Sequence, residues 1–263
     1  MVVKFKIKTK KSVMEICFHY EITIIYLYLI MDKELLVQRM FSSAARRYDI
    51  NNTVLSFGIH HYWKRYAIAQ TGASEGSTVL DVCAGTADIA ILLAKRVGTS
   101  GHVTAVDLNP EMLEIGKRKV QKNRLGDIIS CTLGNAESLQ FGDNKFDATT
   151  VGFGVRNVKN LEKAFSEMYR VTRPGGRVVC LEFTQPANRL IRYLYDFYSF
   201  TLLPAMGTII SGDRTGIYNY LPDSIRKFPL PEALRQLMLG VGFSKVYYIP
   251  LSGGIVAVHV GTK

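Results

Sequence analysis

From Ser77 onward, short runs of β-branched and other apolar residues alternate with amphipathic stretches of helical spacing. This alternation predicts five strands, at Thr78–Val82, Val103–Asp107, Ile128–Leu133, Phe146–Val151 and Arg177–Phe183. It predicts three helices between them, at Ile89–Val97, Pro110–Gln121 and Leu161–Thr172. Strands that alternate with helices form a parallel sheet covered on both faces, so we expect an α/β fold.

The last part of the chain breaks this alternation. A helix at Pro231–Leu239 ends at two glycines, which are common helix stops, and two strands follow at Lys245–Ile249 and Ile255–Val260. The Ser252-Gly253-Gly254 turn between these strands is typical of an antiparallel hairpin. We therefore expect a Rossmann-like, mainly parallel sheet that a C-terminal antiparallel hairpin closes.

Two other segments are predicted to be largely helical and to lie around the sheet. The first is Phe41–Gln70, which carries Tyr48 and His60. The second, residues 188–228, is rich in Tyr and Phe, and we expect two helices and a loop that cover a substrate. Residues 35–263 are expected to form one domain that includes this insert.

Residues 1–34 are expected to be an N-terminal extension outside the fold. They hold a basic run, Lys4–Lys11, and an apolar run, Ile22–Met31, which is too short for a bilayer span of ~20 residues. A signal peptide would need a small-residue cleavage site, and a mitochondrial presequence would be rich in Arg and Ser. We favour a disordered extension or an upstream-extended start with Met31 as the natural first residue.

The chain is basic, with 33 Lys and Arg residues against 22 Asp and Glu residues and a formal net charge of +11. A basic surface suits anionic lipid and nucleic acid equally well, so charge alone does not choose between them. The cysteines Cys17, Cys83, Cys131 and Cys180 are widely spaced and form no CxxC pair. We therefore expect neither a zinc cluster nor a disulfide framework. This cysteine usage fits a reducing compartment.

A buried strand, a bend of small residues and a helix follow one another in Val79–Asp88. Small residues let the backbone approach a ligand closely, and a helix N-terminus offers free N–H groups. The GxGxxG fingerprint of dinucleotide sites is absent, and Cys83 and Ala87 stand where glycines often occur. The candidate binding residues in this motif are Asp81, Gly85 and Thr86.

Two polar positions follow the next two strands. Asp107, 22 residues after Gly85, can accept hydrogen bonds from both hydroxyls of an adenosine ribose, and its alternative role is a turn or a helix cap before Asn109. Asn135 and Ala136 can flank an adenine ring, and the alternative is a helix start with Asn135 as its N-cap.

The segment after the fourth strand, Gly152–Asn157, is expected to face the reacting group. The glycines at positions 152 and 154 suggest a close backbone approach, and Arg156 and Asn157 are polar groups aimed at the ligand crevice. The alternative is that Arg156 pairs with a carboxylate at the domain surface.

Over about residues 35–263, these motifs resemble those of the ubiquinone/menaquinone biosynthesis C-methyltransferases. The most specific signature is Tyr48-Asp49-Ile50-Asn51-Asn52 with Ser56, His60 and Trp63, although the family usually has Met at position 51. Further matching runs are Gly85–Asp88, Asn135-Ala136, Phe153–Asn157, Arg170–Arg177, Leu181–Thr184 and Gly254–His259, with mild changes at Arg173 and Thr184. Residues 1–30 match nothing in the family.

The resemblance implies a class I S-adenosylmethionine-dependent methyltransferase fold with helical lid insertions. It implies S-adenosylmethionine contacts at Thr86, Asp107 and Asn135-Ala136, and through the backbone at Gly152. It also implies a polyprenylated quinol substrate, either a naphthoquinol or a methoxy-benzoquinol. Asp213-Arg214 and Tyr220-Leu221-Pro222 look more like the menaquinone-type members.

Methylation of an aromatic carbon requires that the carbon become nucleophilic and lie in line with the methyl group. Loss of the quinol hydroxyl proton makes the ring carbon nucleophilic, and no metal is required. Arg156 is the first catalytic candidate because its cation can stabilise the phenolate, and Asn157 lies beside it. Arginine is a poor base, so Tyr48, His60 and Asp213 are candidates for proton removal. The alternative for His60 is a structural hydrogen bond.

The aromatic-rich run Leu190–Ile210 is predicted to be an interfacial helix or a wall for the polyprenyl tail, and the alternative is core packing of a lid. Arg192, Asp196 and Pro204 argue against a membrane span. We expect a cytoplasmic protein that is peripheral on the inner membrane, or on the matrix side in a mitochondrion. A homodimer is possible.

Two other functions fit parts of the sequence. An RNA methyltransferase would suit the charge, but amino-directed enzymes of that class usually carry an Asn/Asp-Pro-Pro-aromatic motif where this chain has Gly152–Asn157. We therefore expect no nucleic-acid partner. A non-catalytic cofactor-binding scaffold of a quinone-synthesis complex is the other alternative, and the presence of Arg156 and Asn157 argues against it.

Overall fold

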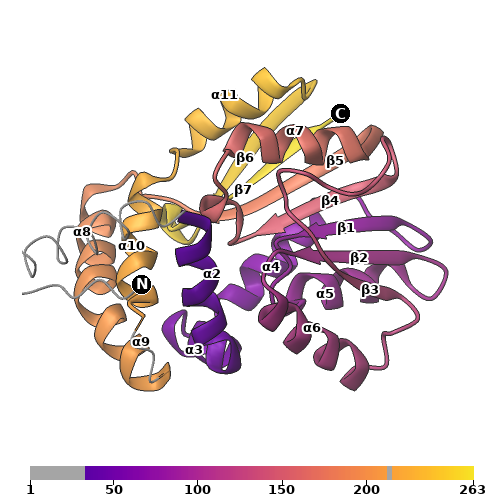
Figure 1. The fold of residues 1–263 in the computed structure, drawn as a ribbon. Coiled ribbons are helices and arrows are strands. Elements are labelled where there is room, and N and C mark those ends of the chain that lie inside the picture. Colours follow the sequence, from indigo (N-terminus) through magenta and orange to yellow (C-terminus); the bar gives the residue numbers. More distant parts are fainter. Residues whose placement is uncertain (1–32, 212–214) are drawn as a thin grey trace, which may run out of the picture.

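The computed structural model describes residues 33–211 and 215–263 (Figure 1). Its centre is a seven-stranded sheet of order β3-β2-β1-β4-β5-β7-β6. The strands are β1 (Thr78–Val82), β2 (His102–Asp107), β3 (Ile129–Leu133), β4 (Phe146–Gly152), β5 (Thr172–Phe183), β6 (Lys245–Leu251) and β7 (Val256–Thr262). Strands β1 to β5 pair in parallel, and β7 pairs antiparallel with β5 and β6. The predicted fold class, including the terminal hairpin, is confirmed.

Helices cover both faces of this sheet. They are α4 (His60–Ala69), α5 (Asp88–Val97), α6 (Pro110–Lys122), α7 (Leu161–Val171) and α11 (Pro231–Val241), with one-turn helices η2 (Val155–Asn157) and η4 (Ser252–Gly254). In Figure 1, α7 and α11 lie on one face, and α4, α5 and α6 lie on the other. Two of these helices begin at an asparagine N-cap: Asn109 accepts a hydrogen bond from the Met112 N–H, and Asn160 accepts one from the Lys163 N–H.

Each face of the sheet has its own apolar core. On one side, Phe146 packs with Phe165 and Met168 of α7 and Leu234 of α11, all with exposed fractions near zero. On the other side, Val79, Val103 and Ala148 pack against α5. The β-strands are therefore buried on both faces, as expected of a parallel sheet between helical layers.

The start of β5 differs from the prediction. Strand β5 begins at Thr172, where a helix was expected to end, because Thr172 pairs with Phe146 before the chain bulges and Arg177 pairs with Ala148. The Pro-Gly-Gly turn lies inside this bulge, and Gly175 has a left-handed φ of 77°. The N-terminal segment Phe41–Gln70 is largely helical, as predicted, and it is interrupted where Phe57 and Gly58 are both left-handed.

The N-terminal helices and the insert form a cover beside the sheet. The cover consists of α2 (Lys33–Ala44), η1 (Ala45–Arg47), α3 (Tyr48–Leu55), α8 (Arg189–Phe197), the π-helix η3 (Tyr198–Leu202), α9 (Leu203–Ser211) and α10 (Ile217–Lys227). Met40 and Leu55 from the first segment pack with Leu203 and Tyr218 from the insert. The two segments predicted to surround the sheet thus pack against each other, with α8 to α10 outermost in Figure 1.

Candidate active site

A cavity of about 400 Å³ lies between the carboxyl ends of the parallel strands and the cover. Eleven of the twelve predicted site residues are described by the structure, and all eleven line this cavity. They are Asp81, Gly85, Thr86, Asp107, Asn135, Ala136, Gly152, Arg156, Asn157, Tyr48 and His60. The twelfth, Asp213, lies outside the described residues, as do residues 1–32 of the predicted extension. Residues distant in the sequence therefore converge on one crevice at the edge of the sheet.

The bend after β1 is unusually tight for its composition. Cys83 and Ala87 have left-handed φ angles of 55° and 63°, and Gly85 between them has a φ of 54°. Left-handed geometry costs a residue with a Cβ about 1–2 kcal/mol, so both residues hold a conformation suited to glycine. Glycines are common at these two positions of such bends because glycine adopts left-handed φ angles without strain.

Asp107 holds this bend in place from the end of β2. One carboxylate oxygen accepts the Gly85 N–H at 2.7 Å, and the other accepts the Asn109 N–H at 2.8 Å. Burial raises the pKa of Asp107, and these backbone hydrogen bonds oppose that shift. The cap of α6 is Asn109 rather than Asp107, so the helix-cap alternative for Asp107 is wrong.

The loop after β3 brings Asn135 and Ala136 to the cavity without starting a helix, so that alternative is wrong as well. The Asn135 side chain accepts the Glu137 N–H at 2.8 Å, and residues 135 and 138 form an isolated bridge. Glu137 in turn accepts the N–H groups of Lys159 and Asn160 at 2.7 and 3.0 Å. Glu137 therefore ties the predicted adenine loop to the loop that carries Arg156.

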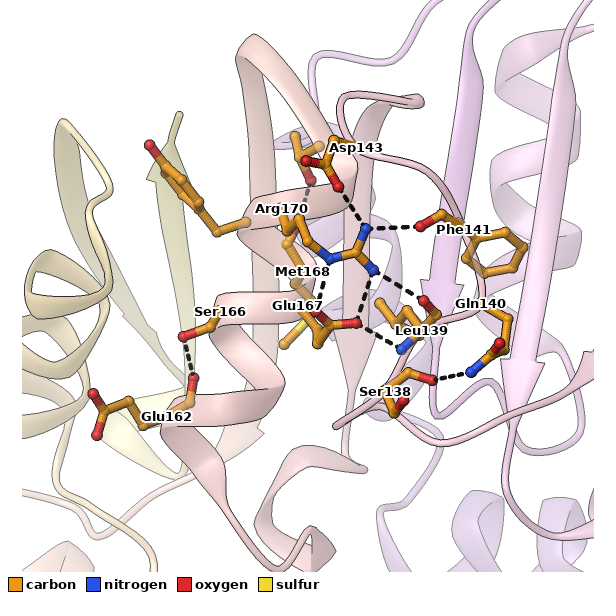
Figure 2. Close-up of polar contacts among 12 residues, drawn as sticks. Ser138, Leu139, Gln140, Phe141, Asp143, Glu162, Ser166, Glu167, Met168 and Arg170 are labelled. Atoms are coloured by element: carbon orange, nitrogen blue, oxygen red, sulfur yellow. Dashed lines mark hydrogen bonds and ion pairs between the residues drawn. The ribbon is translucent and has the colours of Figure 1, made fainter.

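The far end of the same loop is clamped onto α7 by Arg170 (Figure 2). Arg170 donates to the carbonyl groups of Leu139 and Phe141 at 2.9 and 2.7 Å and pairs with Asp143 at 2.7 Å. Glu167 pairs with Arg170 and accepts the Leu139 N–H at 2.7 Å. None of these residues lines the cavity, so we assign Arg170 a structural role.

Thr86 is engaged in a charged network that links the bend to the cover. Its hydroxyl donates to Asp49 of α3 at 2.6 Å, and Lys119 of α6 pairs with Asp49 at 2.7 Å. Lys119 also pairs with Asp88, which pairs with Lys64 of α4 at 2.7 Å. Although burial acts in the opposite direction, the two lysines lower the pKa of Asp88 to about 2. Any contact from Thr86 to a ligand must therefore share its hydroxyl or use its backbone.

Gly152 and Gly154 are needed at the end of β4 because the backbone passes very close to its neighbours. A Cβ at Gly152 would lie 2.2 Å from Cδ1 of Ile89, and a Cβ at Gly154 would lie 2.3 Å from Cβ of Cys83. Phe153 between them is left-handed, with a φ of 58°. Close approach here brings the η2 turn, and with it Arg156, beside the β1 bend.

Arg156 pairs with a carboxylate, but in the interior rather than at the surface. Its Nη1 lies 2.8 Å from Oε1 of Glu182, and the two side chains are 5% and 1% exposed. Burial lowers the pKa of Arg156, but the adjacent Glu182 carboxylate outweighs this effect, and the net shift is upward. Beside it, Asn157 accepts the Tyr220 hydroxyl at 3.0 Å.

A model of the ubiE/COQ5 methyltransferase family matches residues 30–263. The chain belongs to this family. It is 45% identical over 227 residues to the ubiquinone/menaquinone biosynthesis C-methyltransferase UbiE of Hydrogenovibrio crunogenus, a match covering 86% of this chain and 89% of the relative. It is 42% identical over 231 residues to UbiE of Idiomarina loihiensis, covering 88% and 92%. The suspected resemblance is confirmed.

Solved structures support the fold. A SAM-dependent methyltransferase from Aquifex aeolicus aligns with a TM-score of 0.56 at 18% identity, covering 75% of this chain and 88% of that one. Phosphoethanolamine N-methyltransferase 2 of Haemonchus contortus, in complex with S-adenosyl-L-methionine, aligns with a TM-score of 0.55 at 16% identity, covering 76% and 52%. As a member of the ubiE/COQ5 family, the protein is a C-methyltransferase that uses S-adenosylmethionine.

Two residues at the site, Glu182 and Tyr195, are not among the predicted site residues. Glu182 was quoted in a motif but given no role, and Tyr195 of α8 was seen only as part of an aromatic run. Tyr195 lines the cavity, and burial raises its pKa to about 12. The one available signal for Glu182 was an acid at an inward-facing position of a buried strand, which requires a partner.

Proposed function

We propose that this protein transfers a methyl group from S-adenosylmethionine to a ring carbon of a polyprenylated quinol in quinone biosynthesis. The observation that carries this proposal is that polar and apolar residues line different parts of one cavity. Asp107 and Asn135 line one part, Arg156 lines another, and apolar residues of the cover, such as Leu55, Tyr198 and Leu203, line the rest. Polar groups suited to a cofactor and an aryl oxygen thus share one continuous cavity with apolar groups suited to a tail.

The residues around the β1 bend fit S-adenosylmethionine. We assign Asp107 to the ribose hydroxyls, Asn135 and Ala136 to the adenine ring, and Gly85, Thr86 and Gly152 to the backbone approach. Asp81 is 1% exposed, and its Oδ2 atom has no hydrogen-bond partner among the described residues. Burial raises the pKa of Asp81 to about 7, so this carboxylate is suited to an incoming cation such as the cofactor ammonium group.

When bound, the cofactor supplies an electrophilic methyl group on a sulfonium centre. The protein must then favour the quinol phenolate, because the oxygen lone pair makes the adjacent ring carbon nucleophilic. Transfer of that methyl group to the ring carbon would leave the electron pair of the carbon–sulfur bond on sulfur. The ring proton leaves to solvent and the oxygen regains a proton, so one proton is released overall. We assign Arg156 to the stabilisation of the phenolate oxygen.

His60 is the proton acceptor that we propose among the described residues. Ser56 gives its only hydroxyl hydrogen to the Asn52 carbonyl at 2.6 Å, so the 2.8 Å contact with His60 requires Nδ1 of His60 to be the donor. Burial, together with Lys64, lowers the pKa of His60 to about 4. The imidazole is therefore neutral and Nε2 carries the lone pair, but the lowered pKa makes His60 a weak base, so it can only relay the proton to solvent.

The outer surface of the cover suits a lipid substrate delivered from a membrane. Leu190, Tyr193, Leu194 and Phe197 form one stripe on α8, with exposed fractions from 55% to 70%, and Arg189 is exposed beside them. In the described part of the chain, no helix is long and apolar enough to cross a membrane. We propose peripheral binding of this stripe to an anionic bilayer, on the cytoplasmic side of the inner membrane.

The proposal is tested with S-adenosylmethionine labelled in its methyl group. The purified protein is incubated separately with a short-chain demethylmenaquinol, a methoxy-benzoquinol and total RNA. Label in the organic extract with either quinol supports the proposal and identifies the ring class. Label in RNA alone, or in none of the three, would overturn it, and the last result would favour the non-catalytic scaffold.

A further inference from the structure

We propose that the Arg156 end of the cavity is a binding site for an anionic aryl oxygen, in which Tyr195 donates a hydrogen bond to the substrate and Glu182 is the positioning residue for Arg156. The proposal deepens the proposed function and rests on it for the identity of the substrate. It adds two residues, on α8 and β5, that neither the motifs nor the family comparison assign.

Arg156 is held from several directions, which leaves one part of its guanidinium group available. Nη1 donates to Glu182 at 2.8 Å and to the carbonyl oxygen of Phe153 at 2.5 Å, and Nε donates to Ser224 at 3.3 Å. The guanidinium carbon lies 5.6 Å from the ring centroid of Phe183. The contacts to described residues use Nη1 and Nε, so Nη2 is the nitrogen that remains to face a ligand in the cavity that Arg156 lines.

Glu182 fixes this orientation from the interior of the sheet. Its Oε1 atom accepts both Arg156 Nη1 and the Phe183 N–H, each at 2.8 Å, and its Oε2 accepts the Arg156 N–H at 3.4 Å. Glu182 does not line the cavity and cannot touch a ligand there. Its effect on catalysis must therefore pass through the charge and position of Arg156.

Three phenols from three different helices line the same cavity as Arg156 and are affected by its charge. They are Tyr48 of α3, Tyr195 of α8 and Tyr220 of α10. Burial raises the pKa of each phenol despite that charge, so all three stay protonated and act as donors. The Tyr220 proton is committed to Asn157. The contact of Tyr48 with Asn52 acts to lower the pKa of Tyr48, so the amide is the donor there and the Tyr48 proton stays available. Tyr48 and Tyr195 are therefore the phenols that can donate to a ligand, and Tyr195 is the one on the insert, next to Ser199.

A second observation also points to a polar ligand group at this place. Ser199, one turn after Tyr195 and next to its hydroxyl, is 3% exposed and lines the cavity. Its hydroxyl makes no hydrogen bond of good geometry with a described residue, although it lies close enough to the Tyr195 hydroxyl to oppose the rise in the pKa of that phenol. A buried unsatisfied hydroxyl is costly, and it lies in the π-helix η3, a local irregularity that is frequent at functional sites. A ligand oxygen bound near Arg156 and Tyr195 would give the Ser199 hydroxyl a polar group to contact.

The site is tested by equilibrium binding of 4-nitrophenol, which is yellow only as the phenolate, to protein saturated with S-adenosylhomocysteine. Absorbance titration gives the affinity for the neutral and the anionic form. We expect the wild-type protein to prefer the anion by about tenfold or more. Tyr195→Phe should reduce this preference several-fold, whereas Tyr193→Phe, on the exposed side of the same helix, should leave it unchanged.

Glu182→Gln separates positioning from simple loss of structure. We expect the variant to bind S-adenosylhomocysteine normally but to lose most of the preference for the anionic probe, because the side chain of Arg156 is no longer held. Equal preference for the two probe forms in the wild-type protein would overturn the proposal. So would a Tyr195→Phe variant that keeps the full preference. Neither result depends on methyl transfer, so a failed quinol assay is distinguishable from a failed oxygen site.

Discussion

Oε1 of Glu182 lies 2.8 Å from Nη1 of Arg156, and both side chains are almost completely shielded from solvent. A buried ion pair contributes little net stability, but removal of one partner leaves the other charge unpaired. We expect Arg156→Ala to lower the free energy of unfolding by about 3–5 kcal/mol. The double variant Arg156→Met, Glu182→Gln should recover much of this loss in urea unfolding. A double variant as unstable as the single one would show that the two side chains are not coupled.

The contact between Gly154 and Cys83 predicts a compensating pair of substitutions. Gly154→Ala should destabilise the protein by about 1–3 kcal/mol, because the new methyl group would overlap Cβ of Cys83. Cys83→Gly removes that obstacle and also relieves a left-handed residue. Thermal unfolding of the double variant should therefore approach that of the wild type. If the double variant instead lost as much stability as the two single variants together, the Cβ atom of Cys83 would not be the cause of the destabilisation by Gly154→Ala.

His259 gives the fold a dependence on pH that is separate from the active site. Burial lowers its pKa to about 4, although the hydrogen bond to the Pro231 carbonyl acts in the opposite direction. The unfolded chain takes up this proton at pH ~6.5, so stability is complete above that pH and falls as the pH drops toward 4. His60 acts in the same direction. Urea unfolding of His259→Gln should show a weaker loss over this range, and an unchanged slope would contradict the assignment.

The exposed stripe on α8 predicts binding to anionic vesicles. Leu194→Ser with Phe197→Ser should reduce sedimentation with phosphatidylglycerol vesicles by about tenfold or more, because two side chains that would enter the interface are lost. Leu133→Ser, at an equally exposed residue on β3, is the matched control and should bind normally. Analytical ultracentrifugation of the same variants tests a homodimer. Disruption of a dimer with unchanged vesicle binding would reassign the stripe to a protein interface.

Much of the fold was predictable because its determinants are local. The periodicity of apolar residues gave five parallel strands and the hairpin, and the order of motifs placed Gly85, Asp107 and Arg156 at one edge of the sheet. The predicted start of β5 was wrong because backbone geometry departs from the pattern there. The bulge before Arg177 and the left-handed Phe57 have no signal in hydrophobic periodicity.

The contacts that complete the site were not predictable because they join distant residues. Arg156 and Glu182 are 26 positions apart, and Thr86 meets Asp49 across 37 positions. Tyr195 was one aromatic residue among many in its segment, and only the packing of α8 against the cavity distinguishes it. Residue type identified Arg156 as catalytic, but not the interior carboxylate that orients it.

The most direct test of the central claim is the position of the transferred carbon. The protein is incubated with S-adenosylmethionine carrying a carbon-13 methyl group and with the quinol that it methylates, and the product is examined by NMR. We predict a carbon-13 signal coupled to a ring carbon, and the same product at a rate at least about 100-fold lower with Arg156→Ala under conditions where that variant is folded and binds S-adenosylhomocysteine. A methyl group on oxygen, or an unchanged rate in the variant, would contradict the account.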